Sequence, residues 1–291
     1  MTAGTQPTNE DAAAHAASRR PRSWVRTAAI VAGVVVIGGL VAFVVEWNRS
    51  TTHPVSMDAA RRRAGTGTTS PERSTTPTRL QPAAGVYEYR GDGAEHLDTP
   101  PKTATQGPTM PGTVTDLGGG CWRLRVDYNT NHWQSWDYCS VATGLTEKAG
   151  AFFQRLDLVA FTVDTSSSYV CDPPVDTIRT SQTPGDQWPQ RCHGTSTASK
   201  GDVISSGPYT YVGQENLDIG GQRVTALHYH RVRALSGGPS GTEDVNTLFD
   251  AHTGMPLQNS RVITVHSDAL IGGVTYTETG TFHLASLTPT R

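Results

Sequence analysis

The stretch that decides the fold runs from Cys121 to Cys139 and reads CWRLRVDYNTNHWQSWDYC. Its first part alternates apolar with polar residues, and aromatic residues recur after an Asn-rich turn around Thr130. Such alternation is typical of a β-strand with one buried face, because successive side chains point to opposite faces. The stretch therefore predicts an antiparallel β-hairpin.

The turn also sets the register of this hairpin. If Thr130 is its centre, Cys121 lies opposite Cys139 and Trp122 lies opposite Tyr138. Facing Cα atoms in an antiparallel pair are about 4.5–5.5 Å apart, a separation that a disulfide tolerates. The same register pairs aromatic side chains on the apolar face. We therefore expect a Cys121–Cys139 disulfide.

The remaining cysteines are Cys171 and Cys192, which bracket a Pro-rich segment. An even number of cysteines in an oxidising compartment implies disulfides, so these two pair by default. We interpret both bonds as structural, because the chain has no Cys-x-x-Cys and the spacing does not suit a zinc site. A disulfide sulfur at Cys192 also cannot be the nucleophile of a Cys–His site with His193.

Residues 85–291 are rich in Val, Thr, Tyr, Phe and Trp runs separated by Gly, Pro, Asp and Asn, which is typical of antiparallel strands and turns. Glu147–Asp157 is the one segment that is ambiguous between helix and strand. We predict an all-β fold, either a curved antiparallel sheet or a partly open barrel. The candidate strands are 86–90, 112–117, 121–128, 132–139, 152–163, 208–213, 223–234, 245–250, 260–266 and 273–286.

Two short matches raise the hypothesis of two related β units. The Gly-x-Tyr-x-Tyr strand at 85–89 resembles the one at 207–211, and Thr143-Gly144-Leu145 resembles Thr253-Gly254-Met255. The offsets of the two matches differ, so a duplication would require loops of different length.

A transmembrane helix is predicted at residues 27–45, where 19 residues carry no charge. An α-helix of that length spans roughly 28 Å, close to the apolar thickness of a bilayer. Trp24 and Trp47 flank the run, and Arg19, Arg20, Arg22 and Arg26 precede it. The positive-inside rule then predicts a cytoplasmic tail at 1–26 and an extracytoplasmic C-terminal domain in the cell envelope.

Other interpretations of this apolar run fit less well. A cleaved signal peptide has a small-x-small site, a lipoprotein has a cysteine after the run, and a buried core helix is improbable in so polar a chain. Residues 46–84 are rich in Thr, Ser, Pro and Arg, so we expect a disordered stalk. This leaves 85–291 as a disulfide-stapled β domain on a single-pass membrane protein.

Charge is divided unevenly along the chain. Residues 1–84 hold 10 Lys/Arg and 5 Asp/Glu, whereas 85–291 hold 14 and 21, so the outer domain has a net charge of −7. An acidic domain argues against nucleic acid as a partner, because phosphate binding needs a basic face.

Two groups of residues are candidates for binding. The aromatic hairpin residues Trp122, Trp133, Trp136 and Tyr138 suit an apolar ligand or partner, although core packing is the alternative. His228 and His230 are two apart on a predicted strand, so both rings face one side and could bind one metal; packing beside apolar neighbours is the alternative. The sequence identifies no third ligand, and we assign no metal site and no cofactor.

Catalytic motifs give little support for an enzyme. The chain has no Gly-x-Ser-x-Gly elbow, and Gly237–Gly241 is the nearest approach to one. We therefore assign no catalytic residue.

The segment from Asp250 to Leu257, Asp-Ala-His-Thr-Gly-Met-Pro-Leu, resembles a turn of curved-sheet envelope proteins. These include lipoprotein-carrier-like domains, whose concave sheet holds acyl chains. The layout also resembles signal-anchored secreted β-domain proteins of actinobacteria. The chain departs from the carrier pattern in lacking a lipobox and a clear covering helix.

Three hypotheses follow for function. The first is a non-catalytic envelope binding domain for a lipid or other apolar ligand, and it is the one that we favour. The second is a scaffold or interaction domain for another envelope protein. The third is an envelope enzyme.

Overall fold

The computed structural model describes residues 52–65, 80–157, 162–199, 201–269 and 272–290. The chain divides into two compact units, Met1–Trp47 and Asn48–Arg291, and all of the described residues belong to the second. The predicted tail and transmembrane helix lie outside the described residues. Within the described ranges, no helix is long and apolar enough to cross a membrane.

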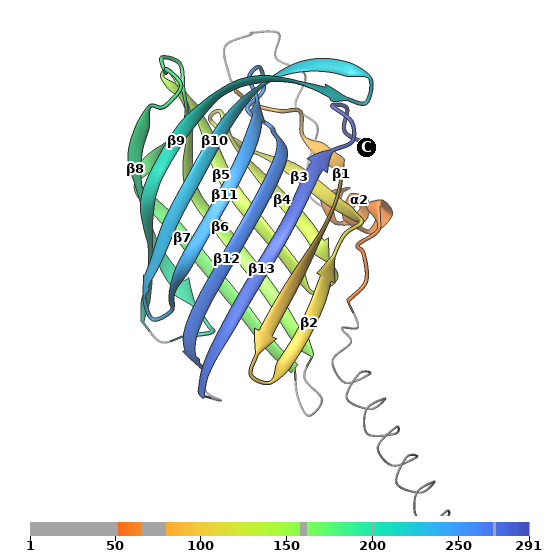
Figure 1. Cartoon of the computed structure of the whole chain (residues 1–291). Helices are drawn as coiled ribbons and strands as arrows, with labels where there is room; N and C mark the ends of the chain where they lie inside the picture. Colours follow the sequence, from red (N-terminus) through yellow and green to blue (C-terminus); the bar gives the residue numbers. More distant parts are fainter. Residues whose placement is uncertain (1–51, 66–79, 158–161, 200, 270–271, 291) are drawn as a thin grey trace, which may run out of the picture. The chain divides into compact units, whose positions relative to one another are not determined.

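The described part is almost entirely β-structure, as predicted (Figure 1). One short helix precedes thirteen strands, and each strand runs antiparallel to its neighbours. The elements are α2 (Met57–Gly65), β1 (Gly85–Asp98), β2 (Pro101–Gln106), β3 (Thr109–Gly118), β4 (Cys121–Asn129), β5 (His132–Val141), β6 (Gly144–Asp157), β7 (Thr162–Arg179), β8 (Gln187–Ser196), β9 (Asp202–Ile219), β10 (Gln222–Gly237), β11 (Ser240–Asp250), β12 (Pro256–Ala269) and β13 (Gly272–Leu284).

The sheet closes on itself into a barrel. β1 pairs with β13 along one edge, and with both β3 and β2 along the other. Because β2 and β3 share one edge of β1, thirteen strands make a wall of twelve positions. The predicted fold class, an all-β curved sheet or partly open barrel, is thus confirmed. The structure shows in addition that the barrel is closed.

The hairpin register deduced from the sequence is confirmed. Cys121 faces Cys139 and Trp122 faces Tyr138 across β4 and β5. Both expected disulfides, Cys121–Cys139 and Cys171–Cys192, are present. The ambiguous segment Glu147–Asp157 lies in strand β6.

The core is an aromatic cluster on the inner faces of the strands. Buried aromatic rings pack in stacked, tilted or edge-to-face pairs; for example, Tyr209 stacks on Tyr229 at 5.2 Å and Trp122 is tilted against Tyr138 at 4.8 Å between centroids. Such contacts add to the free energy gained from burying these large side chains. The buried aromatic members are Tyr87, Tyr89, Trp122, Tyr128, Trp136, Tyr138, Trp188, Tyr209, Tyr211, Tyr229, Phe249 and Phe282.

The hairpin between β9 and β10 bends over one end of the barrel (Figure 1). Its tip residue Ile219 is buried, and Leu217 and Val224 pack against the core. The tip can approach the backbone of Ala285 closely because Gly220, with φ of 59°, has no side chain there. This end of the barrel is therefore covered by the chain itself.

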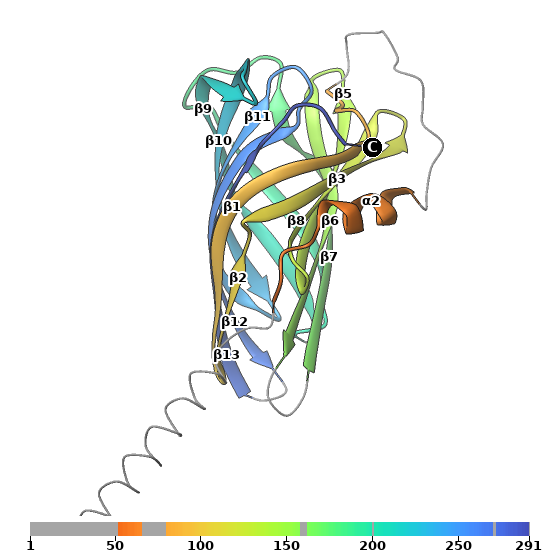
Figure 2. The ribbon, with the colours of Figure 1, turned by 90° about the vertical axis from the view of Figure 1, so that its right-hand side faces the viewer.

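Part of the predicted stalk is folded, which corrects the expectation of disorder across 46–84. Helix α2 lies on the outside of the barrel beside β1 and β3 (Figure 2). Arg63 donates to both oxygens of Asp127 at 2.9 Å, and His53 and Thr130 are joined through their backbones. These tertiary contacts order a segment whose own composition supplies little apolar surface.

The two sequence matches do not define a single internal repeat. The Gly-x-Tyr-x-Tyr segments lie on β1 and β9, the first and eighth positions of the wall, which run in opposite directions. The Thr-Gly turns precede β6 and β12, the fifth and eleventh positions, which run in the same direction. No one rotation relates both matches, and the strands form one continuous wall.

Candidate functional site

The inner faces of the strands also carry buried charged side chains, next to the aromatic cluster. On β10 the inward positions are Tyr229, Arg231 and Arg233, so arginines follow an aromatic residue on one face. A wall of twelve positions encloses a wider interior than that of an eight-stranded barrel, and long side chains are needed to fill it. The charged residues on this surface are Glu95, His132, Glu147, Arg231, Arg233, Glu243, Arg261 and Glu278.

Arg261 and Gln106 meet over two glycines at the seam that closes the barrel. The register places Gln106, Gly93, Gly280 and Arg261 side by side on β2, β1, β13 and β12. Arg261 Nη2 donates to Gln106 Oε1 above them, and a Cβ on Gly280 would lie 2.7 Å from that oxygen. The two glycines therefore make room for a hydrogen bond that spans the seam.

Glu278 lies at the centre of this polar group. Its carboxylate accepts from Arg261 Nε at 2.6 Å, from Gln106 Nε2 at 2.9 Å and from the Tyr276 hydroxyl at 2.8 Å. Burial alone would raise the pKa of Glu278, but Arg261, His132 and the hydrogen bonds outweigh burial and lower this pKa to about 2. Glu278 is thus a buried, fully compensated carboxylate.

His132 is buried beside two glutamates. Its Nδ1 lies 2.7 Å from Glu95 Oε1. Burial favours the neutral ring, but Glu95 and Glu278 together raise the pKa of His132 above its ordinary value. With His132 protonated, the three arginines and the histidine of this set balance its four glutamates.

A second group of charges surrounds Glu147. Tyr169 donates to Glu147 Oε1 at 2.7 Å, and Arg231 and Arg233 each have a nitrogen 3.7 Å from Glu147 Oε2. Arg231 also lies 3.6 Å from Glu243. These arginine distances are ion-pair distances, longer than hydrogen bonds.

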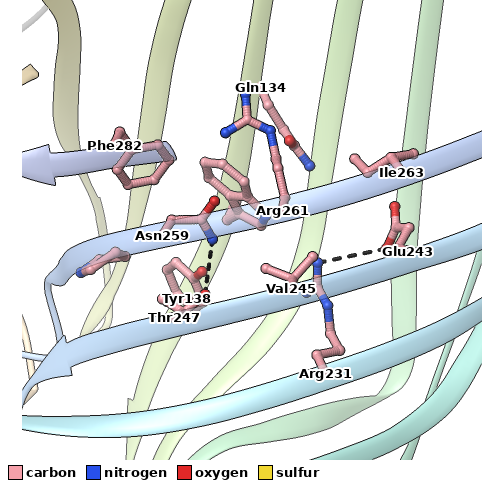
Figure 3. Close-up of a pocket in the computed structure, with 12 residues that line it drawn as sticks. Gln134, Tyr138, Arg231, Glu243, Val245, Thr247, Asn259, Arg261, Ile263 and Phe282 are labelled. Atoms are coloured by element: carbon pink, nitrogen blue, oxygen red, sulfur yellow. Dashed lines mark hydrogen bonds and ion pairs between the residues drawn. The ribbon is translucent and has the colours of Figure 1, made fainter. Parts of the chain in front are cut away.

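Arg231 and Arg261 line a small cavity inside the barrel (Figure 3). The cavity volume is about 30 Å³. One water molecule needs at least about 10–15 Å³, so the space suits a guest of one to a few atoms and not an acyl chain. The other labelled residues on its wall are Gln134, Tyr138, Glu243, Val245, Thr247, Asn259, Ile263 and Phe282.

A larger groove of about 660 Å³ lies at the covered end of the barrel. The β9–β10 hairpin, the turn after β11, the segment before β1 and the chain after β13 form its walls. Sites for small molecules usually have volumes of about 300–1,000 Å³, so this groove has the size of a ligand site. It is lined by Pro82, Ala83, Tyr87, Arg223, Val224, Thr225, Asp250, Ala251, His252, Thr253, Met255, Leu284 and Leu287.

The floor of the groove is apolar and its rim is polar. Tyr87, Met255 and Leu284 are buried, whereas Arg223 and His252 are exposed. Burial raises the pKa of Tyr87 to about 12, so its hydroxyl stays protonated and donates to the Ala83 carbonyl at 2.8 Å. The groove can therefore hold an apolar body and leave a polar end at the surface.

The aromatic hairpin residues fall on different faces of the wall. Trp122, Trp136 and Tyr138 are buried inside the barrel, and the last two line the small cavity. Trp133 lies on the other face, where the Arg125 guanidinium is 4.0 Å from its ring centroid. The four residues thus do not form one binding surface.

His228 and His230 lie on one face of β10, as predicted, but bind different partners. His228 Nδ1 is 2.9 Å from Glu215, and His230 Nε2 is 2.8 Å from Asp244. Over the described ranges, one cluster of potential ligand atoms is close enough to share a metal, and it comprises Glu147, Cys171 and Cys192. Both sulfurs are consumed in a disulfide, so this cluster is not a metal site.

Sequence reasoning missed the interior charges and most of the groove. The turn singled out by its resemblance, Asp250–Leu257, does form one wall of the groove. For the interior, the available signal was the arginines at 231 and 233 in alternation with Tyr229. That alternation marks the same face of the strand but does not say that the face points inward.

The comparisons with known proteins give a distant structural likeness. No protein-family model matches the chain, and no curated protein is significantly similar to it. Among solved structures, the hypothetical lipoprotein YmcC from Escherichia coli (K12) matches with 12% identity and a TM-score of 0.30, over 78% of this chain and 97% of that chain. At this TM-score the likeness carries no argument about the function of this chain.

Proposed function

We propose that the β domain is a non-catalytic binding domain of the cell envelope, held at the membrane by residues 27–45, and that it receives an apolar or amphipathic small molecule in the end groove. The observation that carries this proposal is the 660 Å³ groove with a buried apolar floor. Its volume and lining are those of small-molecule sites.

The alternative location for such a ligand is the barrel interior, and its geometry is unfavourable. The aromatic cluster and the buried charged residues occupy much of the interior, and the cavity that they line is about 30 Å³. An acyl chain held inside the barrel, as in the concave sheet of a carrier, would have to displace buried aromatic side chains. The end groove requires no such displacement.

Surface hydrophobicity gives the scaffold hypothesis less support. The exposed large apolar residues on the described wall are spread over separate strands, and single exposed apolar residues are ordinary. They are Leu117, Val141, Val170, Val212, Val232 and Val262.

Photo-crosslinking tests the proposed site on the full chain as it is recovered from a host with a cell envelope. The probe is a ten-carbon alcohol with a diazirine on its chain, and the labelled peptides are mapped by mass spectrometry. We expect labelling at 82–87, 223–225 and 284–287. Val224→Asp and Leu287→Asp, which place a charge in the groove wall, should reduce it several-fold.

Val262→Asp is the matched control, because Val262 is 55% exposed on the outer wall. It should leave labelling of the groove unchanged, and melting curves should show that all three variants fold. Labelling of groove peptides no stronger than that of outer-wall peptides would reject the groove as a binding site.

A further inference from the structure

We propose, on the basis of the function proposed above, that the groove selects an anionic amphiphile, with its carboxylate or phosphate-like head at the rim formed by Arg223 and His252. The apolar body then lies on the floor formed by Tyr87, Met255 and Leu284. This assigns a chemical class to the ligand and a recognition role to two exposed residues.

The polar groups that a ligand head can reach at the rim include an arginine and a histidine. Arg223 is exposed on β10 next to the tip of the covering hairpin, and its guanidinium has five N–H donors and no acceptor. Within the described part of the chain, no carboxylate forms an ion pair with it. His252 is exposed in the turn after β11, which lies beside Thr225, because the Ala251 N–H donates to the Thr225 carbonyl at 3.0 Å.

The acidic groups near the rim are engaged by the backbone and neighbouring side chains. Asp250 is 8% exposed, and its two oxygens accept from the His252 N–H at 3.1 Å and from the Thr253 hydroxyl at 2.6 Å. Asp218 lies opposite Arg223 in the strand ladder of the hairpin, and its Oδ1 accepts from the Gly221 N–H at 2.9 Å. Both carboxylates therefore already have donors of their own, and Arg223 is the one arginine among the residues that line the groove.

Three photoreactive probes with the same ten-carbon chain test this selection. They differ only in a carboxylate, hydroxyl or ammonium head, and each is applied below its aggregation concentration to the full chain in its membrane. We expect the carboxylate probe to label groove peptides most and the ammonium probe least. Arg223→Gln should lower carboxylate labelling about two- to fivefold, the range of an exposed charge interaction, and leave hydroxyl labelling unchanged.

The comparison of wild type with Arg223→Gln in the same membrane removes differences in how the probes partition into lipid. His252→Gln is a second variant with a milder expected effect in the same direction. Equal labelling by all three heads, or a preference for ammonium, would overturn the anionic selection and leave the groove as a site for apolar ligands. Failure of every probe would instead overturn the proposed binding function itself.

Discussion

Arg261 lies inside the barrel with 3% of its side chain exposed, ion-paired to Glu278 at 2.6 Å. Its guanidinium carbon also lies 3.9 Å from the ring centroid of Tyr128. Desolvating both charges is costly, and their mutual attraction offsets that cost only while both are present. The pair is therefore more sensitive to loss of one partner than to loss of both.

Arg261→Met should lower the free energy of unfolding by about 3–5 kcal/mol, because it leaves the Glu278 carboxylate buried without its cation. Arg261→Met combined with Glu278→Met should recover much of this loss, since no unpaired charge remains. Urea denaturation of the single and double variants measures the coupling. Additive losses would show that the two side chains do not compensate each other.

The interior charges also predict how stability depends on pH. The pKa of Glu278 is lowered to about 2 in the folded chain, so its contribution is full above its ordinary value near 4.5 and is lost as pH falls toward 2. The pKa of His132 is raised, so its contribution is full below its ordinary value of 6.5 and is lost as pH rises through the raised value. Stability should therefore be greatest between these limits.

Melting temperatures recorded against pH check this prediction. His132→Gln should remove part of the decline on the alkaline side, because Gln cannot bind the extra proton. Glu278→Gln should flatten the decline on the acid side. A wild-type curve that keeps rising above pH 7 would contradict the role assigned to His132.

At the scale of elements, the β4–β5 hairpin was predictable because local alternation, a tight turn and a disulfide all agree on one register. β7 and β8 were largely missed, and the candidate strand 152–163 ran across the boundary between β6 and β7. β7 holds a Ser-rich run and Pro173-Pro174, and β8 holds Pro189. Proline lowers strand propensity, so only tertiary pairing identifies these segments as strands.

The candidate site was less predictable than the fold. A long side chain such as Arg231 or Glu278 on an alternating strand is the usual mark of a solvent-facing position. In this closed barrel such side chains instead point inward, because the interior is too wide to be filled by short apolar residues alone. The groove is assembled from four segments distant in sequence, which no local pattern brings together.

The Cys171–Cys192 disulfide lies beside the shortest ladder of the wall, because β7 and β8 pair only over Ser167–Val170 and His193–Ser196. Cys171→Ser with Cys192→Ser should cost about 3 kcal/mol, the loop-entropy value for a ring of about 20 residues. We also expect faster amide exchange in β7 and β8, where the disulfide supplements few hydrogen bonds.

The matched control is Cys121→Ser with Cys139→Ser, which opens a ring of similar size on the β4–β5 ladder of eight residue pairs. It should cost a similar free energy without faster exchange in β7 and β8. Equal exchange in both double variants would show that the second disulfide does not secure this part of the wall.

Helix α2 is attached to the barrel in part through Arg63, whose side chain is 43% exposed, and Asp127, which is 2% exposed. Arg63→Ala should cost at most about 1 kcal/mol, because the pair is partly solvated and Arg125 still neutralises Asp127. Hydrogen exchange over residues 52–65 should nevertheless become faster. Arg62→Ala, an exposed neighbour on the same helix, is the control, and an equal effect would contradict the role of Arg63.

At the scale of the whole molecule, closure through the β1–β13 pairing restricts how the domain can bind a partner. An open sheet could add a strand from another chain at its edge, but closure pairs β1 with β13 and, among the described strands, leaves only the short β2 without a second ladder. Recognition is then left mainly to the barrel ends and the outer wall. The groove lies at one of those ends, which agrees with a small-molecule ligand better than with strand addition.

The membrane anchor is the prediction that concerns the full chain. If residues 27–45 span the bilayer, the full chain should remain in the membrane fraction after washing at high salt and alkaline pH, because about 19 apolar residues bind lipid irreversibly in practice. A chain that begins at residue 52 behind a cleavable export signal should be released in soluble form with both disulfides intact. Protease added outside intact cells should reach the β domain of the full chain and digest it once the domain has been unfolded. Retention of the shortened chain in the membrane would show that a surface of the β domain, and not residues 27–45, provides the attachment.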